Sequence, residues 1–308
     1  MKSASAEATA RQALEGILTP IATPFTSDDA LDEGALRRNV AKWMATPLHG
    51  LVVLGSNGEA PQLEDDEADR IIGIVRDGVP ASKWLLAGTG RESTKGTIAA
   101  TKRAAALGAD AALVRTPSFF KPQLTADIFV RHYTEVADAS PIPILLYNVT
   151  MFTGVSLPID AVEKLAAHPN IVGMKESGSD IGHIAELVAR TPDDFTVLGG
   201  SATMLLFSLS AGCAGAIVAL AMLVPELCLE LWTLVREGKF QQAHTLQRRL
   251  MPLARSIGGQ HGVPGVKAAL DAAGYEGGYP RPPLRPVPAN VSETIRKQLD
   301  ALSLSIGH

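Results

Sequence analysis

Short apolar, β-prone segments alternate with helix-like segments along most of this 308-residue chain. The apolar segments cover residues 17–25, 51–54, 84–87, 111–114, 142–147, 171–175, 196–198 and 216–219. Helical patterns cover residues 33–44, 65–75, 94–107, 126–137, 159–167, 181–189, 202–209 and 225–237. Parallel strands that are buried on both faces read as continuous apolar runs, and this strand–helix period is typical of a barrel. We therefore expect an α/β protein, a (β/α)8 TIM barrel, over residues 16–237.

A doubly wound parallel sheet is the competing architecture, and it usually carries a glycine-rich phosphate loop. Gly88 and Gly90 supply the first two glycines of such a loop, but Ser93 stands where the third belongs. The sequence contains no Walker-type phosphate loop either. These observations favour the barrel.

The pattern becomes purely helical after Glu237, with helix-like segments at residues 240–257, 263–273 and 292–302. The proline-rich residues 280–288 read as an extended connector between the last two of them. We therefore expect three parts: an N-terminal extension (residues 1–15), the barrel (16–237) and a C-terminal helical extension (238–308).

The charge balance and the cysteines limit the partners and the compartment. The chain has 28 Lys and Arg against 32 Asp and Glu, a net charge of −4. Nucleic acids and acidic membranes favour basic surfaces, so neither is expected as a partner. Cys213 and Cys228 lie in apolar segments and are expected to be buried thiols, which suits a reducing compartment. The histidines show no metal-site spacing, so no metal is expected.

Two stretches bear on localisation. Residues 1–7 lack the apolar core of a signal peptide, which predicts a cytoplasmic protein. The Ser/Ala content and Arg11 leave the mitochondrial matrix as the alternative. Residues 204–224 carry no charge and are long enough to cross a bilayer. Serines and the glycines Gly212 and Gly215 interrupt this stretch, and no basic anchors flank it, so we expect a buried helix, a turn and a buried strand.

Polar residues follow three of the expected strands, and catalytic groups of a barrel gather at the C-terminal ends of its strands. The motif Gly55-Ser56-Asn57-Gly58-Glu59 follows the second strand, Tyr147 ends the fifth and Lys175 ends the sixth. Taken singly, each has a structural explanation: a chain-reversing turn, a ring that fills the barrel mouth and a solvated lysine. Their common place at the strand ends instead predicts one site.

The three groups together suit the chemistry of a 2-oxo acid. An amine that is withdrawn from water is more readily neutral and can attack a carbonyl to form a Schiff base. The glycines around Ser56 allow close backbone approach, so N–H groups and the hydroxyl can hold a carboxylate. Tyr147 can carry protons to and from the carbonyl that Lys175 attacks. The resulting imine is an electron sink, which makes the adjacent C–H or C–C bond easier to break.

At these residues the chain resembles the dihydrodipicolinate synthase and N-acetylneuraminate lyase superfamily of pyruvate-dependent class I aldolases. The motifs are residues 55–59, Leu146-Tyr147-Asn148-Val149 and Gly173-Met174-Lys175-Glu176-Ser177. The resemblance implies that Lys175 forms the imine, that Tyr147 relays protons and that no metal or organic cofactor is needed. The further residues that it implies in substrate binding are Ser56, Asn57, Gly55, Ser177, Gly199 and Ile217.

Within the superfamily, the chain is most similar to the 4-hydroxy-2-oxoglutarate aldolase branch. The similarity lies in residues 55–59, 85–94, 168–175 and 262–267. It implies a carbon–carbon lyase that acts on a small 2-oxo acid and forms a homo-oligomer, a dimer or a tetramer. The alternatives are a 4-hydroxy-tetrahydrodipicolinate synthase, a 2-keto-3-deoxy sugar-acid aldolase or dehydratase, and a non-catalytic 2-oxo acid binding protein.

Two residues depart from the family pattern. Phe152 stands where the synthases usually carry an arginine for a substrate carboxylate, and an aromatic ring cannot replace a guanidinium. This substitution disfavours the synthase. Phe119 stands where family members usually place a tyrosine that reaches the neighbouring subunit's site. We expect Phe119 to contact a neighbouring subunit, and the proton relay to do without that hydroxyl.

Overall fold

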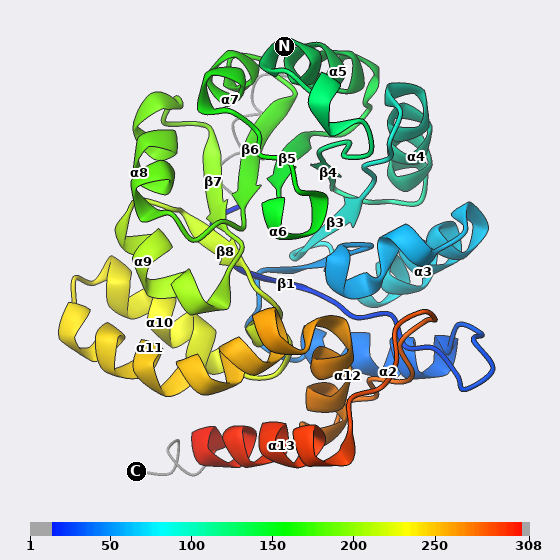
Figure 1. Cartoon of the computed structure of the whole chain (residues 1–308), viewed down its shortest axis with the longest axis vertical. Coiled ribbons are helices and arrows are strands. Elements are labelled where there is room, and N and C mark those ends of the chain that lie inside the picture. The colour runs from blue at the N-terminus through cyan, green and yellow to red at the C-terminus, as the bar shows by residue number, and fades with distance from the viewer. Residues whose placement is uncertain (1–13, 304–308) are drawn as a thin grey trace.

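The computed structural model describes residues 14–303, so most of the expected N-terminal extension lies outside the described residues. Strands β1 to β8 pair in parallel in chain order, and β8 closes on β1 (Figure 1). The strands are β1 (Gly16–Pro20), β2 (Gly50–Val53), β3 (Trp84–Gly88), β4 (Ala111–Arg115), β5 (Ile144–Asn148), β6 (Ile171–Glu176), β7 (Thr196–Gly199) and β8 (Gly215–Ile217). The expected (β/α)8 TIM barrel is confirmed.

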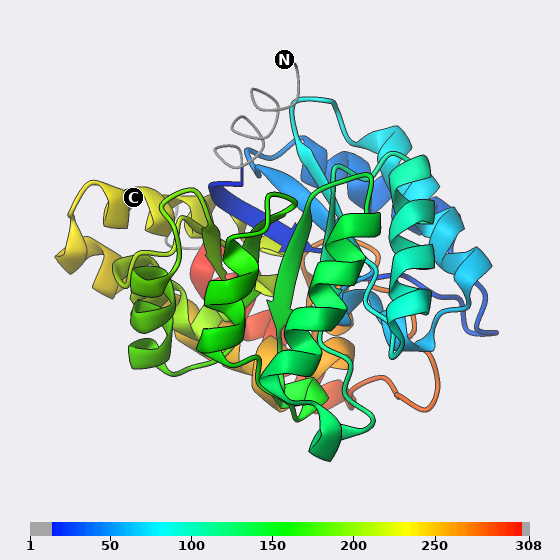
Figure 2. The same cartoon turned by 90° about the horizontal axis from the view of Figure 1, so that it is seen from above.

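Helices surround the strands. In Figure 2 the helices of the middle of the chain, coloured cyan to green, stand in a row outside them. The helices of the barrel are α2 (Glu33–Met44), α3 (Asp65–Gly78), α4 (Thr94–Ala106), α5 (Ala126–Ala139), α6 (Thr150–Thr153), α7 (Ile159–Ala166), α8 (Ile181–Arg190), α9 (Leu205–Ser210) and α10 (Pro225–Arg236). Short 3₁₀ turns are η1 (Ser56–Gly58), η2 (Ala60–Gln62), η3 (Lys121–Gln123), η4 (Ala202–Met204) and η5 (Ala219–Met222).

The helix starts follow local sequence signals. Asp32 caps α2 by accepting a hydrogen bond from Ala35 N. Glu64 and Glu67 form a capping box at the start of α3, where acidic side chains complement the positive end of the helix dipole. Ser93, which occupies the position of the missing third glycine, caps α4. The residue that argues against a phosphate loop therefore starts a helix.

The apolar side chains form layers inside and outside the sheet. The interior of the barrel holds a cluster that includes Leu18, Leu145 and Val172. Two larger clusters lie between the sheet and the helices, and one of them contains Met174. After the irregularity at the start of β6, side chains alternate between the two faces of the strand, so Met174 outside the barrel places its neighbour Lys175 inside.

One segment differs from what the sequence predicts, and a second decides between two interpretations of the sequence. β1 ends at Pro20, whereas an apolar strand was expected to continue to residue 25. Residues 21–25 are still buried, and their backbone continues as a loop in which Phe25 pairs with Tyr279. The uncharged residues 204–224 form α9, β8 and η5, as expected for a buried segment. Among residues 14–303 no helix is long and apolar enough to cross a membrane.

The C-terminal helices lie together at one side of the barrel (Figure 1). They are α11 (Phe240–Arg255), the π-helical turn η6 (Ser256–Gln260), α12 (Gly262–Ala272) and α13 (Ala289–Ser303). Lys267 of α12 forms an ion pair with Glu59 at 2.6 Å, and the two side chains are only 2% and 0% exposed. Arg281 N also donates to Glu59 Oε2, at 2.8 Å. This contact ties the C-terminal helices to the Gly55–Glu59 loop.

Candidate active site

Lys175 and Tyr147 lie side by side on adjacent strands. The two residues are paired in the register of β5 and β6. Lys175 is only 4% exposed, and its Nζ lies 4.4 Å from the centroid of the Tyr147 ring. Tyr147 belongs to the cluster inside the barrel. The amine and the phenol therefore both face the interior at the C-terminal ends of their strands, where barrel enzymes carry out their chemistry.

The pairing of β5 and β6 depends on a glycine and an irregularity. The register shifts by one residue between Ile144 and Leu145, so that Leu145 lies opposite Gly173. A Cβ at Gly173 would lie 2.4 Å from the carbonyl oxygen of Thr196 on β7, so this close approach requires glycine. Close packing against β7 therefore explains why a glycine precedes Met174-Lys175 in the motif.

A buried hydrogen bond fixes the tips of the same strands. Asn148 Nδ2 donates to Glu176 Oε2 at 2.8 Å, and Asn148 Oδ1 accepts from Leu157 N at 3.1 Å. Glu176 is 1% exposed. Asn148 and Glu176 directly follow Tyr147 and Lys175, so this contact links the strand ends that carry the two candidate catalytic residues.

The loop after β2 brings Ser56 to the same place. Ser56 Oγ lies 3.4 Å from Tyr147 Oη, within hydrogen-bonding range. Ser56 and Asn57 begin the 3₁₀ turn η1, and the first N–H groups of a helix have no partner within it. Thr23 Oγ1 donates to Gly58 O at 2.8 Å and holds the turn against the loop after β1. Two residues whose amides lack a partner within the turn thus line the same cavity as the tyrosine, and with the Ser56 hydroxyl they suit an anion.

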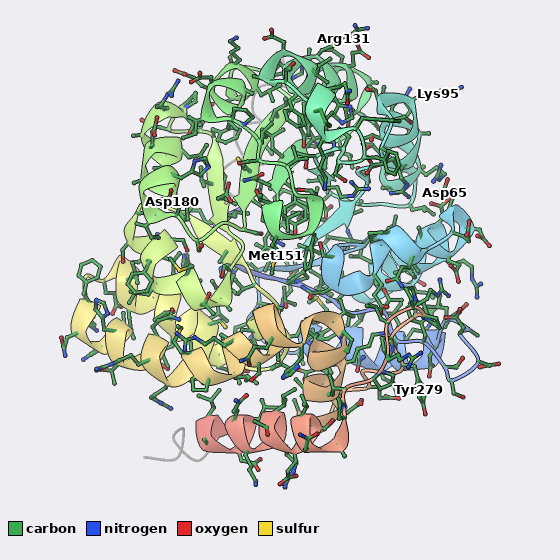
Figure 3. The ribbon with its side chains drawn as sticks, viewed as in Figure 1. Asp65, Lys95, Arg131, Met151, Asp180 and Tyr279 are labelled. Atoms are coloured by element: carbon green, nitrogen blue, oxygen red, sulfur yellow. The ribbon has the colours of Figure 1, made fainter. Side chains whose placement is uncertain are left out.

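These residues share one cavity of about 520 Å³. Of the expected substrate contacts, it is lined by Ser56, Asn57, Ser177 and Ile217, together with Tyr147 and Lys175. None of the described residues that line it is an aspartate or a glutamate. Met151 of α6 forms part of the wall and lies at the centre of the view in Figure 3, whereas Lys95 and Arg131 project from the outer helices. The cavity is large enough for a small-molecule substrate.

Gly55 and Gly199 are not among the residues that line the cavity. A Cβ at Gly199 would lie 2.5 Å from Ser208 Oγ of α9, so this residue faces the outer layer. Its neighbour Gly200 faces the cavity instead, because a Cβ there would lie 2.0 Å from Ser177 Oγ and 3.0 Å from Lys175 Cε. Ser177 Oγ is buried and has no hydrogen-bond partner among the described residues, so it is free to bind a substrate group.

The two phenylalanines line a hollow beside the cavity. This hollow has a volume of about 670 Å³, and Phe152 lines the cavity as well. Phe119 and Phe152 are 76% and 61% exposed. Glu92 holds the Phe119 loop by accepting from the N–H groups of Ser118 and Phe119. Phe119 does not line the Lys175 cavity.

Sequence reasoning missed a second wall of the cavity. Residues 200–203 line it after β7, and so do residues from the end of α11 to the start of α12, including Arg255, Gly258 and Gly259. The sequence carried one signal for the latter, the glycines of Gly258-Gly259 and Gly262-Val263-Pro264-Gly265 at the end of a helical pattern. No motif pointed to Arg255.

Other reactive groups lie away from the cavity. Cys213 and Cys228 are buried free thiols, and burial raises the pKa of Cys213 to about 12. Neither thiol is poised for nucleophilic chemistry. Within residues 14–303, no cluster of three His, Cys, Asp or Glu side chains could hold a metal ion.

Comparisons with known proteins give one consistent result. The profile of the Dihydrodipicolinate synthetase family matches residues 13–302. A 4-hydroxy-tetrahydrodipicolinate synthase of Xanthomonas axonopodis pv. citri is 39% identical over 94% of this chain and 96% of its own length. The protein of the same name from Methanopyrus kandleri is 34% identical over 94% and 97% of the two chains.

A solved structure agrees with these relatives. It is a prophage protein of E. coli K12 that belongs to the dihydrodipicolinic acid synthase family and was determined in complex with pyruvate. It superposes with a TM-score of 0.88 at 27% identity, over 94% of this chain and 99% of the other.

Proposed function

This chain belongs to the dihydrodipicolinate synthetase family, and on that premise we propose that Lys175 forms an imine with pyruvate and that the enzyme makes or breaks a carbon–carbon bond at the methyl carbon of pyruvate. The chain is a carbon–carbon lyase, and the chemistry of its family runs through a lysine imine without an external cofactor. The observation that carries the proposal is the buried Lys175 amine beside the Tyr147 ring, in a cavity whose lining among residues 14–303 includes no carboxylate.

The arrangement supports a definite order of steps. The Ser56–Asn57 turn holds the carboxylate of pyruvate, and Lys175 Nζ attacks its C2 carbon. Tyr147 Oη gives a proton to the departing oxygen, which leaves as water, and the imine forms. Tyr147 Oη, which has given up its proton, takes one from the methyl carbon, and the resulting enamine adds to the carbonyl carbon of an aldehyde, whose oxygen receives that proton. Water then hydrolyses the product imine and frees Lys175. Cleavage runs the same steps in reverse, with the electron pair returning to the imine.

The two candidate reactions differ in the aldehyde that the enamine attacks. The names of the relatives support a 4-hydroxy-tetrahydrodipicolinate synthase, the alternative from the sequence, better than they support the 4-hydroxy-2-oxoglutarate aldolase that the motifs favoured. One observation supports the aldolase: Phe152 forms the cavity wall at the position where the resemblance implies an arginine in synthases. The synthase is therefore our first candidate and the aldolase the second.

The proposal is tested by trapping. The protein is incubated with pyruvate and borohydride, and its intact mass is measured; an increase equal to one reduced pyruvyl group is expected. A protein that gains no mass contradicts the proposal. A kinetic panel then compares condensation of pyruvate with aspartate semialdehyde, cleavage of 4-hydroxy-2-oxoglutarate and cleavage of 2-keto-3-deoxy sugar acids. The reaction with the largest kcat/KM identifies the second substrate.

Tyr147→Phe tests the proton relay. The phenol is 3.4 Å from Ser56 Oγ and lies over the Lys175 amine, so its loss removes the expected proton donor while keeping the ring. We expect kcat to fall by about 10²–10⁴-fold with little change in stability. Tyr279→Phe, which removes a hydroxyl from an exposed tyrosine outside the cavity, is the matched control. Unchanged kcat in Tyr147→Phe would remove the tyrosine from the mechanism.

Phe152→Arg tests which acceptor the cavity is built for. If the missing guanidinium alone limits synthase activity, this substitution raises kcat/KM for aspartate semialdehyde by roughly 10-fold, the effect of one charge-assisted hydrogen bond. Met151→Arg places the same charge on the neighbouring cavity residue and is the control. A fall in synthase activity in Phe152→Arg, or an equal rise in both variants, would contradict a specific role for position 152.

The assembly, the domain boundaries and the compartment remain predictions. We propose a homo-oligomer, a dimer or a homotetramer, because three exposed apolar side chains, Phe119, Met151 and Phe152, line the cavity or the hollow beside it, and exposed Phe120 packs against Phe119. Analytical ultracentrifugation tests this. We propose the division into residues 1–15, 16–237 and 238–308 on the end of the strand–helix alternation at Glu237. A cytoplasmic location is proposed from the two free, buried thiols.

A further inference from the structure

The charges that line the cavity are unbalanced. Among the described residues that line it, two carry a positive charge, Lys175 and Arg255, and none carries a negative one. Lys175 is the imine-forming amine in the proposed mechanism, so its nitrogen is taken up by pyruvate. Arg255 is then the cationic side chain of the described lining that pyruvate does not engage. The cavity is therefore suited to a substrate with more negative charge than the pyruvate carboxylate alone.

Arg255 is free to bind a ligand. It is the last residue of α11 and is exposed. No carboxylate of the described residues lies within ion-pairing distance of it, whereas Arg91 and Arg115 of the neighbouring hollow pair with Asp65 and Glu92 at 3.0 and 2.8 Å. Those two arginines are already neutralised by the protein. Arg255 is not, and its planar donor fork matches a carboxylate.

The surroundings of Arg255 leave room for a substrate. The helix continues from Arg255 into the π-helical turn η6, a feature that is frequent at functional sites. A Cβ at Gly258 or Gly259 in this turn would meet no atom within 4 Å, so the space beside these two glycines is open. The wall after β7 adds hydroxyl groups of Ser201 and Thr203. The lining thus includes two hydroxyls, which lie 3.0 Å apart, and the Arg255 side chain.

We propose that Arg255 binds a carboxylate at the distal end of the second substrate, so that the acceptor of this enzyme is an aldehyde that carries a carboxylate. This inference rests on the proposed function, because it assigns the partner of the pyruvate imine. It applies to both candidate reactions, whose acceptors are aspartate semialdehyde and glyoxylate, and it disfavours the neutral aldehydes of sugar-acid cleavage. Arg255 supplies from α11 the positive charge that Phe152 does not supply from α6.

The test compares Arg255→Ala with wild type on two matched pairs of aldehydes. Glyoxylate is paired with glycolaldehyde, and succinate semialdehyde with butanal; the members of each pair have equal carbon chains and differ in the carboxylate. We expect kcat/KM for the carboxylated aldehyde to fall by about 10- to 100-fold, mainly through KM, and that for the neutral aldehyde to change by less than about 2-fold. Arg255→Lys should recover part of the loss.

Arg249→Ala is the matched control, because Arg249 is an exposed arginine on the same helix and does not line the cavity. It should leave both aldehydes of each pair unaffected. Equal losses for carboxylated and neutral aldehydes in Arg255→Ala, or no loss, would overturn the inference. A wild-type enzyme that traps pyruvate but accepts no carboxylated aldehyde would also overturn the inference.

Borohydride trapping separates this inference from the proposed function. Arg255→Ala should trap pyruvate on Lys175 as completely as wild type does, because the guanidinium is assigned to the second substrate. If wild type traps no pyruvate, the proposed function fails. If wild type and Arg255→Ala both trap pyruvate and show the same preference between the paired aldehydes, the proposed function stands and only the role assigned to Arg255 is wrong.

Discussion

Lys175→Met is expected to abolish the pyruvyl adduct and to lower kcat by at least about 10³-fold, because removal of a nucleophile forces the reaction onto a path without a covalent intermediate. Methionine keeps most of the volume of a side chain that is only 4% exposed, so the barrel should remain folded. Intact mass after borohydride reduction measures the adduct, and circular dichroism checks the fold.

Lys164→Met provides the matched control, because Lys164 is an exposed residue of α7 outside the cavity. It should trap pyruvate as wild type does. Two results would count against an imine at Lys175. One is a pyruvyl adduct that Lys175→Met forms in the same yield as wild type, and the other is a kcat of Lys175→Met within a few-fold of wild type. Peptide mapping of the wild-type adduct would then show which other amine had reacted.

Among the substitutions proposed for this protein, Lys267→Met should cause the largest decrease in the free energy of unfolding. The substitution leaves Glu59 as a buried carboxylate without its cation, and breaking such a pair costs about 3–5 kcal/mol of the free energy of unfolding. The Lys267 ammonium also donates to Tyr279 O at 2.5 Å and lies 4.6 Å from the centre of the Phe25 ring. Urea denaturation should give a lower midpoint with an unchanged slope.

A double variant and a surface pair serve as controls for Lys267→Met. Lys267→Met combined with Glu59→Gln removes both charges and should recover part of the stability, because the penalty comes mostly from the uncompensated carboxylate. Arg37→Met breaks a pair with Asp77 whose side chains are 52% and 68% exposed, and should cost less than about 1 kcal/mol. A Lys267→Met protein as stable as Arg37→Met would mean that the buried pair does not stabilise the fold.

The same substitution should weaken pyruvate binding. Glu59 directly follows the Ser56–Gly58 turn, and its carboxylate is held by Lys267 and by Arg281 N. Loss of this support should raise the KM for pyruvate in the protein that remains folded. A variant that is destabilised but has an unchanged KM would show that the turn is positioned without the ion pair.

The fold and the centre of the site could be predicted because their signals are local. Buried parallel strands must be apolar along their whole length, so their positions are visible in the sequence, and Lys175 and Tyr147 end two of them. The strand-end rule then brings distant residues to one place without knowledge of any contact. Ser56, Tyr147 and Lys175 do line one cavity.

The remaining parts of the site depend on contacts that leave no local pattern. Gly199 and Gly200 look equivalent in the sequence, and only the direction of the chain after β7 decides that Gly200 faces the cavity. Arg255 ends an ordinary amphipathic helix, and its place in the cavity wall follows from how α11 and η6 pack beside the barrel. The ion pair of Glu59 with Lys267 joins residues from opposite ends of the chain, and neither position indicates the other.

The contact of α12 with the loop after β2 has a consequence for recombination between relatives. A chimera that takes its barrel from one parent and its C-terminal helices from another would join a Glu59 from the first to a Lys267 and an Arg281 backbone from the second. A crossover point after β8 lies where the chain leaves the barrel and so looks suitable. It nevertheless places Glu59 and Lys267, which must match, in segments from different parents. Exchange of residues 55–67 together with 262–281 keeps those partners in one inherited block, and such paired exchanges should give folded, active hybrids more often than single crossovers.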